Sequence, residues 1–546
     1  MGEFKCNLLL KRGDLHQHIS ADPGMNLHTA LLEHGILHDA PCCGKGTCGK
    51  CKVRLWGQVS QPTHIEREKL SEQELEEDFR LACQVILLGH GTVEIPEITK
   101  ADIQIEGLSF TVNRHPLARR SVHETPDYGF AFDIGTTTLV AYLVNLETGE
   151  IKGTLSELNE QRAYGADVIT RIAYVMDNPD GEQVLHKLLV HQISAMLETL
   201  LQSREVAKET ICAMSFAGNT TMMHFLMGLN PQSIAVAPFS PVFTQVYCGM
   251  AGKLGFDYHA QCPVYLLPSI SGYIGADVVA GILACALNDE NKIQLLVDLG
   301  TNGEMALSKN GKLLCCSVAA GPAFEGAKIR CGVGGIEGAI DTIVFENGQL
   351  QVHTIGNQQP IGLCGSGLVD AVSMMLEYGI IDEGGRLTDL EEWDEQALCL
   401  SDRLQALNGE KVFVLSEKND LSKDVIFLSQ QDIRELQLAK AAVHAGLITL
   451  LDHQGVTFDQ IDEVWLAGGF GNKININSAI RIGLFPKALA SKMRPAGNTS
   501  GIGSIMTLLS KECRERCEQI KQEAQYLELS GLPGFNDTFV QSIGFE

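Results

Sequence analysis

The chain has 546 residues, with 42 Lys or Arg and 67 Asp or Glu, so its formal net charge is −25. With 45% apolar residues, 20% charged residues and 55 Gly against 17 Pro, the composition excludes a disordered or collagen-like chain. The strong acidity argues against nucleic-acid binding, because a phosphate backbone requires a basic surface. At roughly 100–200 residues per domain, this length predicts about three to five domains.

Seventeen cysteines are the unusual part of the composition. The N-terminal stretch contains only a three-leucine run, and no stretch of about 18 apolar residues follows, so we expect neither a secretory signal nor a membrane span. In a long chain of this kind, many cysteines indicate reduced thiols and metal ligands rather than a disulfide scaffold. The sequence therefore predicts a cytoplasmic protein in a reducing environment, with no membrane contact.

The first predicted domain, residues 1–98, contains a Gly- and Cys-rich loop that reads PCCGKGTCGKC. A further cysteine, Cys83, follows in the sequence RLAC. Three thiolates on a tight loop and one distant thiolate make a four-ligand site, and the glycines allow backbone N–H groups to approach inorganic sulfide. An acidic helical stretch is expected between the loop and Cys83, over Ile65–Arg80, and a final strand over Thr92–Pro96.

The cysteine spacing favours an iron–sulfur cluster over zinc. Zinc sites usually show two CxxC pairs, and only one is present here. The spacing is close to the C-x4-C-x2-C…C pattern of [2Fe–2S] ferredoxins, which predicts Cys42, Cys48, Cys51 and Cys83 as ligands. Because Cys43 gives the x4 spacing and Cys42 gives x5, the choice between these two for the first ligand stays open.

A polar linker is expected over residues 99–127, after which the pattern changes. The runs Phe130–Ile134 and Leu139–Asn145 predict a strand, a Gly-containing turn and a second strand. The same unit recurs in LLVDLGTNGEMAL at Gln294–Leu307. Two related halves predict a two-lobed α/β domain, with a small or middle lobe over residues 128–206 and a large lobe over 207–546.

Both turns carry groups suited to a metal–nucleotide complex. Each has an Asp at a strand end, Asp133 or Asp298, that can hold Mg²⁺ and take part in catalysis. Backbone N–H groups and hydroxyls in such turns can cradle phosphate. A third Gly-rich strand end lies at Val464–Gly471 and suits the close approach of a nucleoside. The predicted nucleotide-binding residues are Gly135, Thr136, Thr137, Thr138, Gly300, Thr301, Asn302, Gly303, Glu304, Gly468, Gly469 and Gly471.

These three motifs, in this order, resemble the phosphate-1, phosphate-2 and adenosine motifs of the superfamily of acetate and sugar kinases, Hsp70 chaperones and actin; no Walker A motif is present. Together with CxGxGxCGxC and with four further segments, nearly the whole chain resembles the reductive activators of corrinoid proteins. The further segments lie at 159–168, 216–222, 320–326 and 497–499. The chain departs from the family in having Cys43 where Gly is usual and in being compact.

The resemblance implies a β-grasp, ferredoxin-like α+β domain, then the linker, then a two-lobed α/β ATPase domain. It implies an ATP-hydrolysing activase that passes one electron from a [2Fe–2S] cluster to an inactive Co(II) corrinoid, restoring Co(I) for methyl transfer. The implied partners are a corrinoid protein, an electron donor and a second copy of the chain. Two alternatives stay open: an activator of another low-potential reductase or dehydratase, and a redox-sensing, nucleotide-binding regulator.

Other polar groups and cysteines receive weaker predictions. The polar cluster Asn159, Gln161 and Arg162 is expected to face the cleft, a dimer partner or solvent. Ser317 and Glu325 flank a Gly-Pro turn and are expected to line the nucleotide site. The cysteines outside the first domain are expected to be buried thiols; those considered singly are Cys315, Cys316, Cys331, Cys364, Cys513 and Cys517.

Overall fold

A computed structural model describes residues 4–13, 15–38, 40, 42, 44–96, 108, 110–119, 126–287, 289–326, 328–407, 409–417, 425–471 and 473–545. Cys43 and most of the predicted linker lie outside the described residues. The chain divides into two compact units, one of residues 1–100 and 158–192 and the other of residues 101–157 and 193–546.

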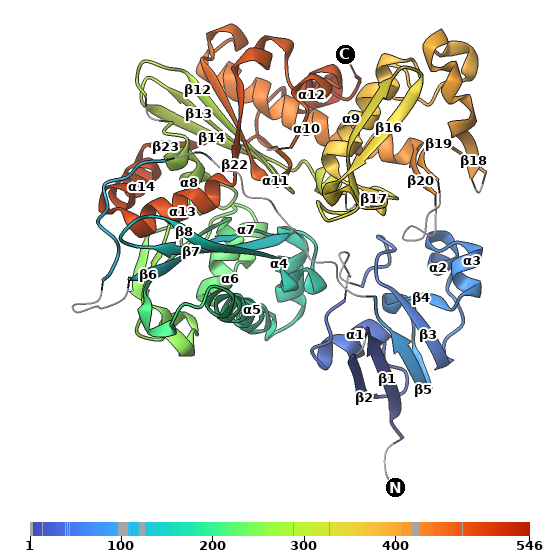
Figure 1. The fold of residues 1–546 in the computed structure, drawn as a ribbon, viewed down its shortest axis with the longest axis horizontal. Helices are drawn as coiled ribbons and strands as arrows, with labels where there is room; N and C mark the ends of the chain where they lie inside the picture. Colours follow the sequence, from blue (N-terminus) through green and yellow to red (C-terminus); the bar gives the residue numbers. More distant parts are fainter. Residues whose placement is uncertain are drawn as a thin grey trace. The chain divides into compact units, whose positions relative to one another are not determined.

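The N-terminal part of the first unit is a five-stranded sheet in the order β2-β1-β5-β3-β4 (Figure 1). β1 pairs antiparallel with β2 and parallel with β5, which is the mixed pattern of a β-grasp domain. Its core is one cluster of buried aliphatic residues that includes Leu8, Leu31, Val53 and Leu81. The elements are β1 Cys6–Arg12, β2 Leu15–Ala21, α1 Leu27–Glu33, β3 Lys52–Val59, α2 His64–Lys69, α3 Glu72–Glu76, β4 Phe79–Leu81 and β5 Leu87–Glu94.

The helical stretch expected over Ile65–Arg80 is instead two short helices and a strand. Thr63 and Ser71 each begin a helix with a reciprocal capping box, to Glu66 and Glu74 respectively. Leu70 between them is extended, with φ −110° and ψ 143°, so the first helix ends there. The last residues of the stretch pair with β3 as β4.

The first unit also holds η2 Glu160–Tyr164, α4 Val168–Asp177 and the start of α5 Gly181–Ser203.

The second unit contains two six-stranded sheets. The first sheet has the order β10-β11-β9-β6-β7-β8, and its centre stacks the rings of Phe132 and Phe216, whose centroids are 4.7 Å apart. Its strands are β6 Tyr128–Ile134, β7 Thr138–Asn145, β8 Ile151–Leu158, β9 Ile211–Gly218, β10 Tyr247–Met250 and β11 Pro263–Leu266. Helices α6 Thr220–Met227 and α7 Gln232–Ala235 follow β9.

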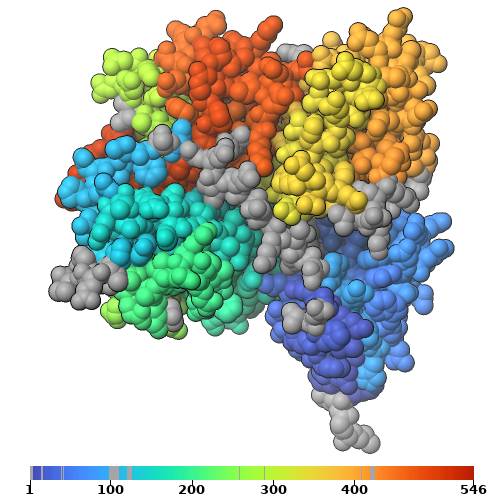
Figure 2. Space-filling view, viewed as in Figure 1, coloured from blue at the N-terminus to red at the C-terminus, as the bar shows by residue number. Residues whose placement is uncertain are grey.

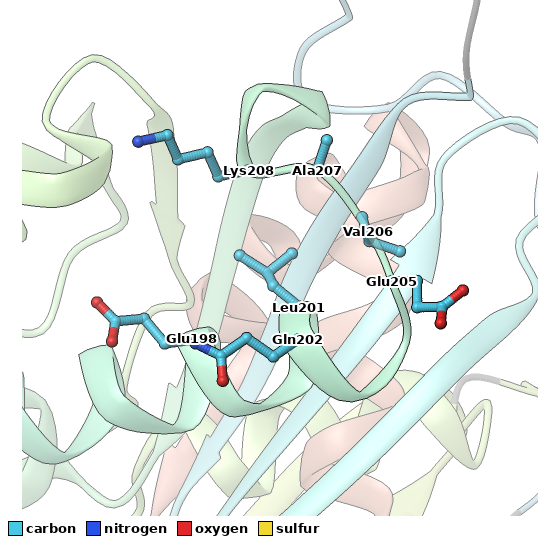
Figure 3. A pocket seen from close by; sticks show the side chains of 7 residues that line it. All are labelled: Glu198, Leu201, Gln202, Glu205, Val206, Ala207 and Lys208. Atoms are coloured by element: carbon cyan, nitrogen blue, oxygen red, sulfur yellow. The ribbon is translucent and has the colours of Figure 1, made fainter.

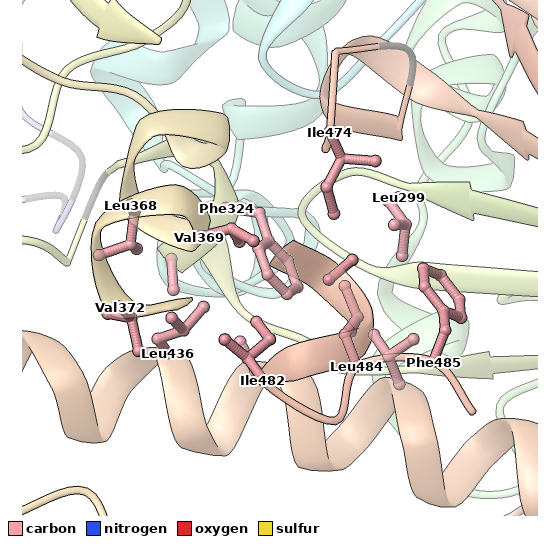
Figure 4. Packing of buried hydrophobic residues seen from close by; sticks show 14 of the residues in the cluster. Leu299, Phe324, Leu368, Val369, Val372, Leu436, Ile474, Ile482, Leu484 and Phe485 are labelled. Carbon is pink, nitrogen blue, oxygen red and sulfur yellow. The ribbon is translucent and has the colours of Figure 1, made fainter. Parts of the chain in front are cut away.

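The second sheet has the order β22-β21-β12-β13-β14-β23. Its strands are β12 Gln294–Leu299, β13 Gly303–Lys309, β14 Lys312–Val318, β21 Glu463–Ala467, β22 Met493–Gly497 and β23 Ala524–Tyr526. A large apolar cluster lies between this sheet, α9 Gly365–Glu377 and α10 Gln430–Gln454, and Figure 4 shows Leu299, Phe324, Val369 and Leu436 within it.

The two sheets repeat one arrangement, as the sequence predicted. β6 and β7 form an antiparallel hairpin with β9 parallel to β6, and β12 and β13 form an antiparallel hairpin with β21 parallel to β12. Asp133 lies next to the last residue of β6, and Asp298 lies next to the last residue of β12. Each predicted Asp therefore stands at the same end of an equivalent strand.

Two helices, α8 Ala276–Ala284 and α13 Thr499–Leu509, pack closely against each other. α13 contacts β6 and β9, and α8 contacts β9 as well as β12 and β13 of the other sheet. A Cβ added at Gly503 would lie 2.5 Å from the Cβ of Ala280, so the crossing depends on glycine.

The rest of the second unit consists of two small sheets and shorter helices, whose yellow to red segments adjoin on the surface in Figure 2. The small sheets comprise β15 Ala339–Glu346, β16 Gln349–Thr354, β17 Gly362–Leu363, β18 Leu404–Leu407, β19 Glu410–Ser416 and β20 Ile426–Ser429. The helices are α11 Gly468–Gly471, α12 Ile476–Arg481, α14 Lys511–Glu523 and α15 Phe535–Gln541. None of the helices in the described ranges combines the length and the apolarity needed to cross a bilayer.

Candidate iron–sulfur and nucleotide sites

The four predicted cluster cysteines come together in the first unit as two pairs of thiols. Cys42 is hydrogen-bonded to Cys48, and Cys51 is hydrogen-bonded to Cys83. The pairs also influence each other, since charge on Cys42 acts on Cys83 and charge on Cys48 acts on Cys51. In the described ranges, no three His, Cys, Asp or Glu side chains converge on a single metal ion. The arrangement of two thiols beside two thiols matches the donor set of a two-iron cluster.

Each pair contains one thiol that ionises readily and one that does not. The hydrogen bond from Cys48 lowers the pKa of Cys42 to about 4, and the hydrogen bond from Cys51 lowers the pKa of Cys83 to about 7. The pKa values of Cys48 and Cys51 are raised, because each donates its proton to its partner and both are buried. Ligation requires all four as thiolates, so the iron ions of a bound cluster would stabilise the negative charge that burial of Cys48 and Cys51 disfavours.

The loop requires glycine and places N–H donors around the sulfur atoms. Gly44, Gly46 and Gly49 have φ of +79°, +76° and +68°. A Cβ at Gly46 would lie 2.8 Å from Gln84 Nε2, a group that also donates to Cys83 Sγ at 3.5 Å. The Lys50 N–H donates to Cys48 Sγ at 3.5 Å. Donors of this kind stabilise thiolates and tune the reduction potential of a cluster.

A buried ion pair fixes the approach to Cys83. Glu66 on α2 is fully buried, and it accepts from Arg80 Nε at 2.8 Å and from Arg80 Nη2 at 2.9 Å. The Thr63 and Leu81 N–H groups also donate to it, at 2.8 and 3.0 Å. Burial raises the pKa of Glu66, but the hydrogen bonds from Arg80 and the two N–H groups outweigh it and hold the pKa below its usual value. The motif RLAC therefore contains a structural arginine.

A second buried pair lies beside the loop. His28 Nδ1 and His38 Nε2 are 2.9 Å apart, and a Cβ at Gly44 would lie 3.1 Å from the His28 ring. Burial, followed by the neighbouring His28, lowers the pKa of His38 to about 3, so both imidazoles are neutral at pH 7. Nothing in the sequence pattern distinguished these two histidines from the other 14, since the chain has 16 in all.

In the second unit, Asp133 is held by the start of α13. Ser500 Oγ donates to Asp133 Oδ1 at 2.7 Å, and Asn498 Nδ2 donates to Asp133 Oδ2 at 2.9 Å. Asn498 is also the N-cap of α13, since its Oδ1 accepts from the Gly501 N–H at 2.8 Å. A residue far along the chain thus orients the first predicted magnesium carboxylate.

The hydroxyl groups of both predicted phosphate turns are hydrogen-bonded within the site. Asn219 Nδ2 donates to Thr136 Oγ1 at 2.7 Å. Thr137 Oγ1 donates to Glu325 Oε2 at 3.0 Å, and Thr301 Oγ1 donates to Glu325 Oε1 at 2.9 Å. The structure therefore brings the first and second phosphate turns to one carboxylate.

The third motif meets the second at Gly468. This residue has φ +85°, and a Cβ there would lie 2.5 Å from both Asp298 Oδ1 and the Leu299 carbonyl oxygen. Within four ångströms, an added Cβ at Gly469 would contact no atom in the described part of the chain. Phe470 stacks on Phe324, with ring centroids 4.5 Å apart. The glycines thus allow the backbone of 468–471 to lie directly against the second phosphate turn.

Four half-buried carboxylates surround this region. Burial and neighbouring acidic groups raise the pKa of Asp298 and of Asp277 to about 7, and they raise the pKa of Glu304 well above its usual value. Burial also raises the pKa of Asp133, whose charge acts on Asp277 and Asp298. Mutually repelling carboxylates are a donor set whose charge a divalent cation can neutralise, although no three of these side chains converge on one point in the described ranges.

Asp277 is the member of this set that the sequence did not single out. It lies in the first turn of α8, in the segment GADVVAG, where an acidic residue is common at any helix start. Ser317, predicted to line the site, lies opposite Glu304 on the paired strand. Only the folded structure shows that Asp277 and Glu304 share the surroundings of the two predicted carboxylates.

Of the polar cluster predicted to face a cleft, a partner or solvent, Asn159 and Gln161 are instead buried, and Arg162 is half-buried. Asn159 and Gln161 are at most 1% exposed. Arg171 Nη1 donates to Gln161 Oε1 at 3.2 Å, and Gln161 Nε2 donates to the Leu185 carbonyl at 2.9 Å. The Gln161 side chain is therefore hydrogen-bonded to both α4 and α5.

The cysteines outside the loop show mainly the expected burial. Cys315, Cys316, Cys364, Cys513 and Cys517 are buried, and Cys331 is half-buried. Cys248 and Cys399 are exposed, so the expectation of a buried thiol is wrong for these two.

Two cavities are lined by residues of the second unit that were not predicted for either site. One, of about 570 Å³, is lined by the end of α5 and the segment after it, including Glu198, Leu201 and Lys208 (Figure 3). The other, of about 420 Å³, is lined by Lys208, Cys212, His259 and neighbouring residues. Neither contains a residue predicted for the cluster or for the nucleotide.

Comparison with known families divides the chain into three matched regions. Residues 12–88 match the 2Fe–2S iron–sulfur cluster binding domain. Residues 128–290 match the RACo middle region, and residues 292–546 match the C-terminal domain of RACo, the ASKHA domain.

Individual relatives and a solved structure agree with this division. The chain is 34% identical over 424 residues to the corrinoid activation enzyme RamQ of Eubacterium limosum, covering 77% of this chain and 71% of RamQ. It is 23% identical over 458 residues to the Co(II) methylated amine-specific corrinoid protein reductase of Methanosarcina barkeri, covering 77% of each. The solved structure of a reductive activator for a corrinoid iron–sulfur protein superposes with a TM-score of 0.73 at 29% identity, over 99% of this chain and 98% of that one. The chain therefore belongs to the family of ATP-dependent reductive activators of corrinoid proteins, with a [2Fe–2S] ferredoxin domain followed by an ATPase domain of the sugar kinase and actin type.

Proposed function

We propose that this protein uses ATP to pass one electron to the inactive Co(II) corrinoid of a partner protein, restoring Co(I) for methyl transfer. The observation that carries the proposal is that one chain holds both a four-thiol site and a pair of Asp-bearing hairpins. The relatives named for corrinoid activation and reduction support the choice of acceptor.

Cys42, Cys48, Cys51 and Cys83 would hold the cluster. A bound [2Fe–2S] group of this type supplies one electron near −400 mV. The loop residues set its surroundings, because the Lys50 N–H and the Gln84 side chain donate to the ligating sulfur atoms. Cys42 is the first ligand in this proposal, since it forms the described pair with Cys48.

The hairpins would hold the nucleotide. Asp133 and Asp298 would bind Mg²⁺ directly or through water, with Asp277 and Glu304 completing the acidic surroundings. Residues 135–138 and 300–303 would bind phosphate through hydroxyl and N–H groups, and residues 468–471 would lie against the adenosine. Ser500 and Asn498 orient Asp133 for this role.

Electron transfer to an acceptor of lower potential is unfavourable, and coupling to ATP can offset this cost. For one electron, every 59 mV of unfavourable potential difference lowers the equilibrium yield about tenfold. A nucleotide changes such an equilibrium only when it binds two conformations with different affinity. The hairpins come from two sheets within one unit, so nucleotide binding to both can favour one arrangement of the sheets.

The test is visible spectroscopy of a Co(II) corrinoid protein mixed with this protein and a reductant, with and without ATP. We expect Co(I) to accumulate only with ATP, and Cys48→Ser and Asp298→Asn each to abolish it. Cys399→Ser is the matched control, since Cys399 is an exposed thiol. If Cys48→Ser reduces the corrinoid as well as the wild type does, the proposal is wrong.

We also propose that a separate donor protein reloads the cluster and that the protein acts as a homodimer in the reducing cytoplasm. Every cysteine in the described ranges is a free thiol, which supports a reducing compartment. Sedimentation of the purified protein at micromolar concentration tests the dimer, and a monomer would refute it.

A further inference from the structure

One carboxylate joins the two predicted phosphate turns. Glu325 accepts from Thr137 Oγ1 at 3.0 Å and from Thr301 Oγ1 at 2.9 and 3.0 Å. These threonines lie in the hairpin turns of two different sheets, 188 and 24 residues from Glu325 along the chain. The Glu325 side chain therefore links the two hairpin turns through hydrogen bonds.

We propose that Glu325 is an internal gate of the nucleotide site, one that occupies the phosphate-binding hydroxyls until the phosphate tail of ATP displaces it. This inference rests on the proposed nucleotide site. A carboxylate offers the same acceptor chemistry as a phosphate oxygen, and each threonine hydroxyl has a single proton to donate. Glu325 and a phosphate group therefore compete for the same two donors.

Charge makes the competition exclusive. A carboxylate and a polyphosphate in one half-buried site repel each other. A Mg²⁺ ion shared by the nucleotide would neutralise part of this charge, but it leaves the two hydroxyl donors contested. Binding of the phosphate tail thus requires Glu325 to leave both threonines.

The position of Glu325 connects this movement to the rest of the unit. Its neighbour Phe324 stacks on Phe470 in the third motif. A Cβ at Gly365 would lie only 1.9 Å from the Phe324 carbonyl oxygen, so the turn packs directly on the start of α9. The short helix η6, Pro322–Glu325, also contacts α10. Displacement of the Glu325 carboxylate would therefore shift contacts with the adenosine motif and with helices α9 and α10.

The experiment compares nucleotide affinity by calorimetry for the wild type, Glu325→Ala and Glu325→Gln. The probe is the ATP analogue AMPPNP with Mg²⁺, and AMP, which lacks the β- and γ-phosphates, is the control ligand. Glu337→Gln is the matched variant, because Glu337 is an exposed carboxylate of the following segment. Freeing two hydroxyl donors and one negative charge is expected to tighten AMPPNP binding about tenfold in Glu325→Ala, with AMP unchanged.

An unchanged or weakened AMPPNP affinity in both Glu325 variants would overturn the gate, since a residue that positions the nucleotide or its metal gives that result. Hydrogen exchange of the wild type is a second measurement that needs no variant. Amides of 320–326 are expected to exchange faster with AMPPNP bound, and slower exchange would overturn the proposal. Wild-type protein that does not bind AMPPNP overturns both the gate and the nucleotide site. Wild type that binds it and reduces corrinoid, with Glu325 variants unchanged, overturns the gate alone.

Discussion

The Glu66–Arg80 ion pair should be essential to the ferredoxin domain. In Arg80→Leu, the fully buried carboxylate of Glu66 loses two charge-assisted hydrogen bonds and keeps only the Thr63 and Leu81 N–H donors. The Arg80 side chain is itself only 8% exposed, so water cannot readily replace it. The variant therefore leaves an uncompensated charge inside the domain.

The magnitude follows from this burial. Removing one partner of a buried ion pair destabilises a protein by about 3–5 kcal/mol. In a domain of roughly 60–100 residues, each kcal/mol lowers Tm by about 4–8 °C, so the expected loss is more than about 10 °C. Lys5→Met removes the exposed Lys5–Asp22 pair, whose side chains are 44% and 58% exposed, and should cost about 1 kcal/mol or less.

The assay is thermal unfolding followed by the visible absorbance of the cluster, which reports on this domain alone. Arg80→Leu should bleach at a much lower temperature than both the wild type and Lys5→Met. If the Arg80 and Lys5 variants bleach within a few degrees of each other, the argument from burial is refuted.

Three further predictions concern other residues. The pKa of His38, about 3 in the folded state, is below its unfolded value, so the free energy of unfolding should fall as pH drops below about 6.5. In urea titrations between pH 6.5 and 5, this fall is up to about 1.4 kcal/mol per pH unit and should become smaller in His38→Leu. An unaltered pH dependence in the variant would contradict this. Gly468→Ala should lower the free energy of unfolding by about 1–3 kcal/mol in calorimetry, whereas Gly469→Ala, with open space around its Cβ, should change it little; equal effects would refute the steric reasoning. Ser500→Ala should weaken the hold on Asp133 by about 1–3 kcal/mol and slow ATP turnover, and wild-type turnover would show that the contact is dispensable.

The sequence was sufficient where chemistry forces a local pattern. A cluster loop must place thiolates at fixed spacing among glycines, so Cys48 and Cys51 could be predicted as ligands from the sequence. The repeated Asp-x-Gly-Thr turns predicted two hairpins, and the structure confirms a hairpin after Asp133 and after Asp298. Local spacing carries this information because the ligand-binding groups come from one turn.

Contacts between distant segments were not predictable in the same way. Asp277 looks like any acidic residue at a helix start, and Ser500 reaches Asp133 across 367 residues of sequence. The break in the expected helix over 65–80 was a different case, because Ser71 and Glu74 form a capping box that local reading can detect. The sequence alone did not show how distant helices pack so that their first turns lie at the same group of carboxylates.

The contact between α8 and α13 at Gly503 determines the distance between the two helices that carry residues of the acidic site. α8 carries Asp277 in its first turn, and α13 carries Ser500, the donor to Asp133, in its own. Where Gly503 meets Ala280, no bulky rotamer separates the two backbones. The distance between the two helices is therefore set by the contact of one backbone with the other, which leaves no room for a flexible side chain between them. The crossing therefore fixes the spacing between Asp277 and Ser500, the residue that donates to Asp133.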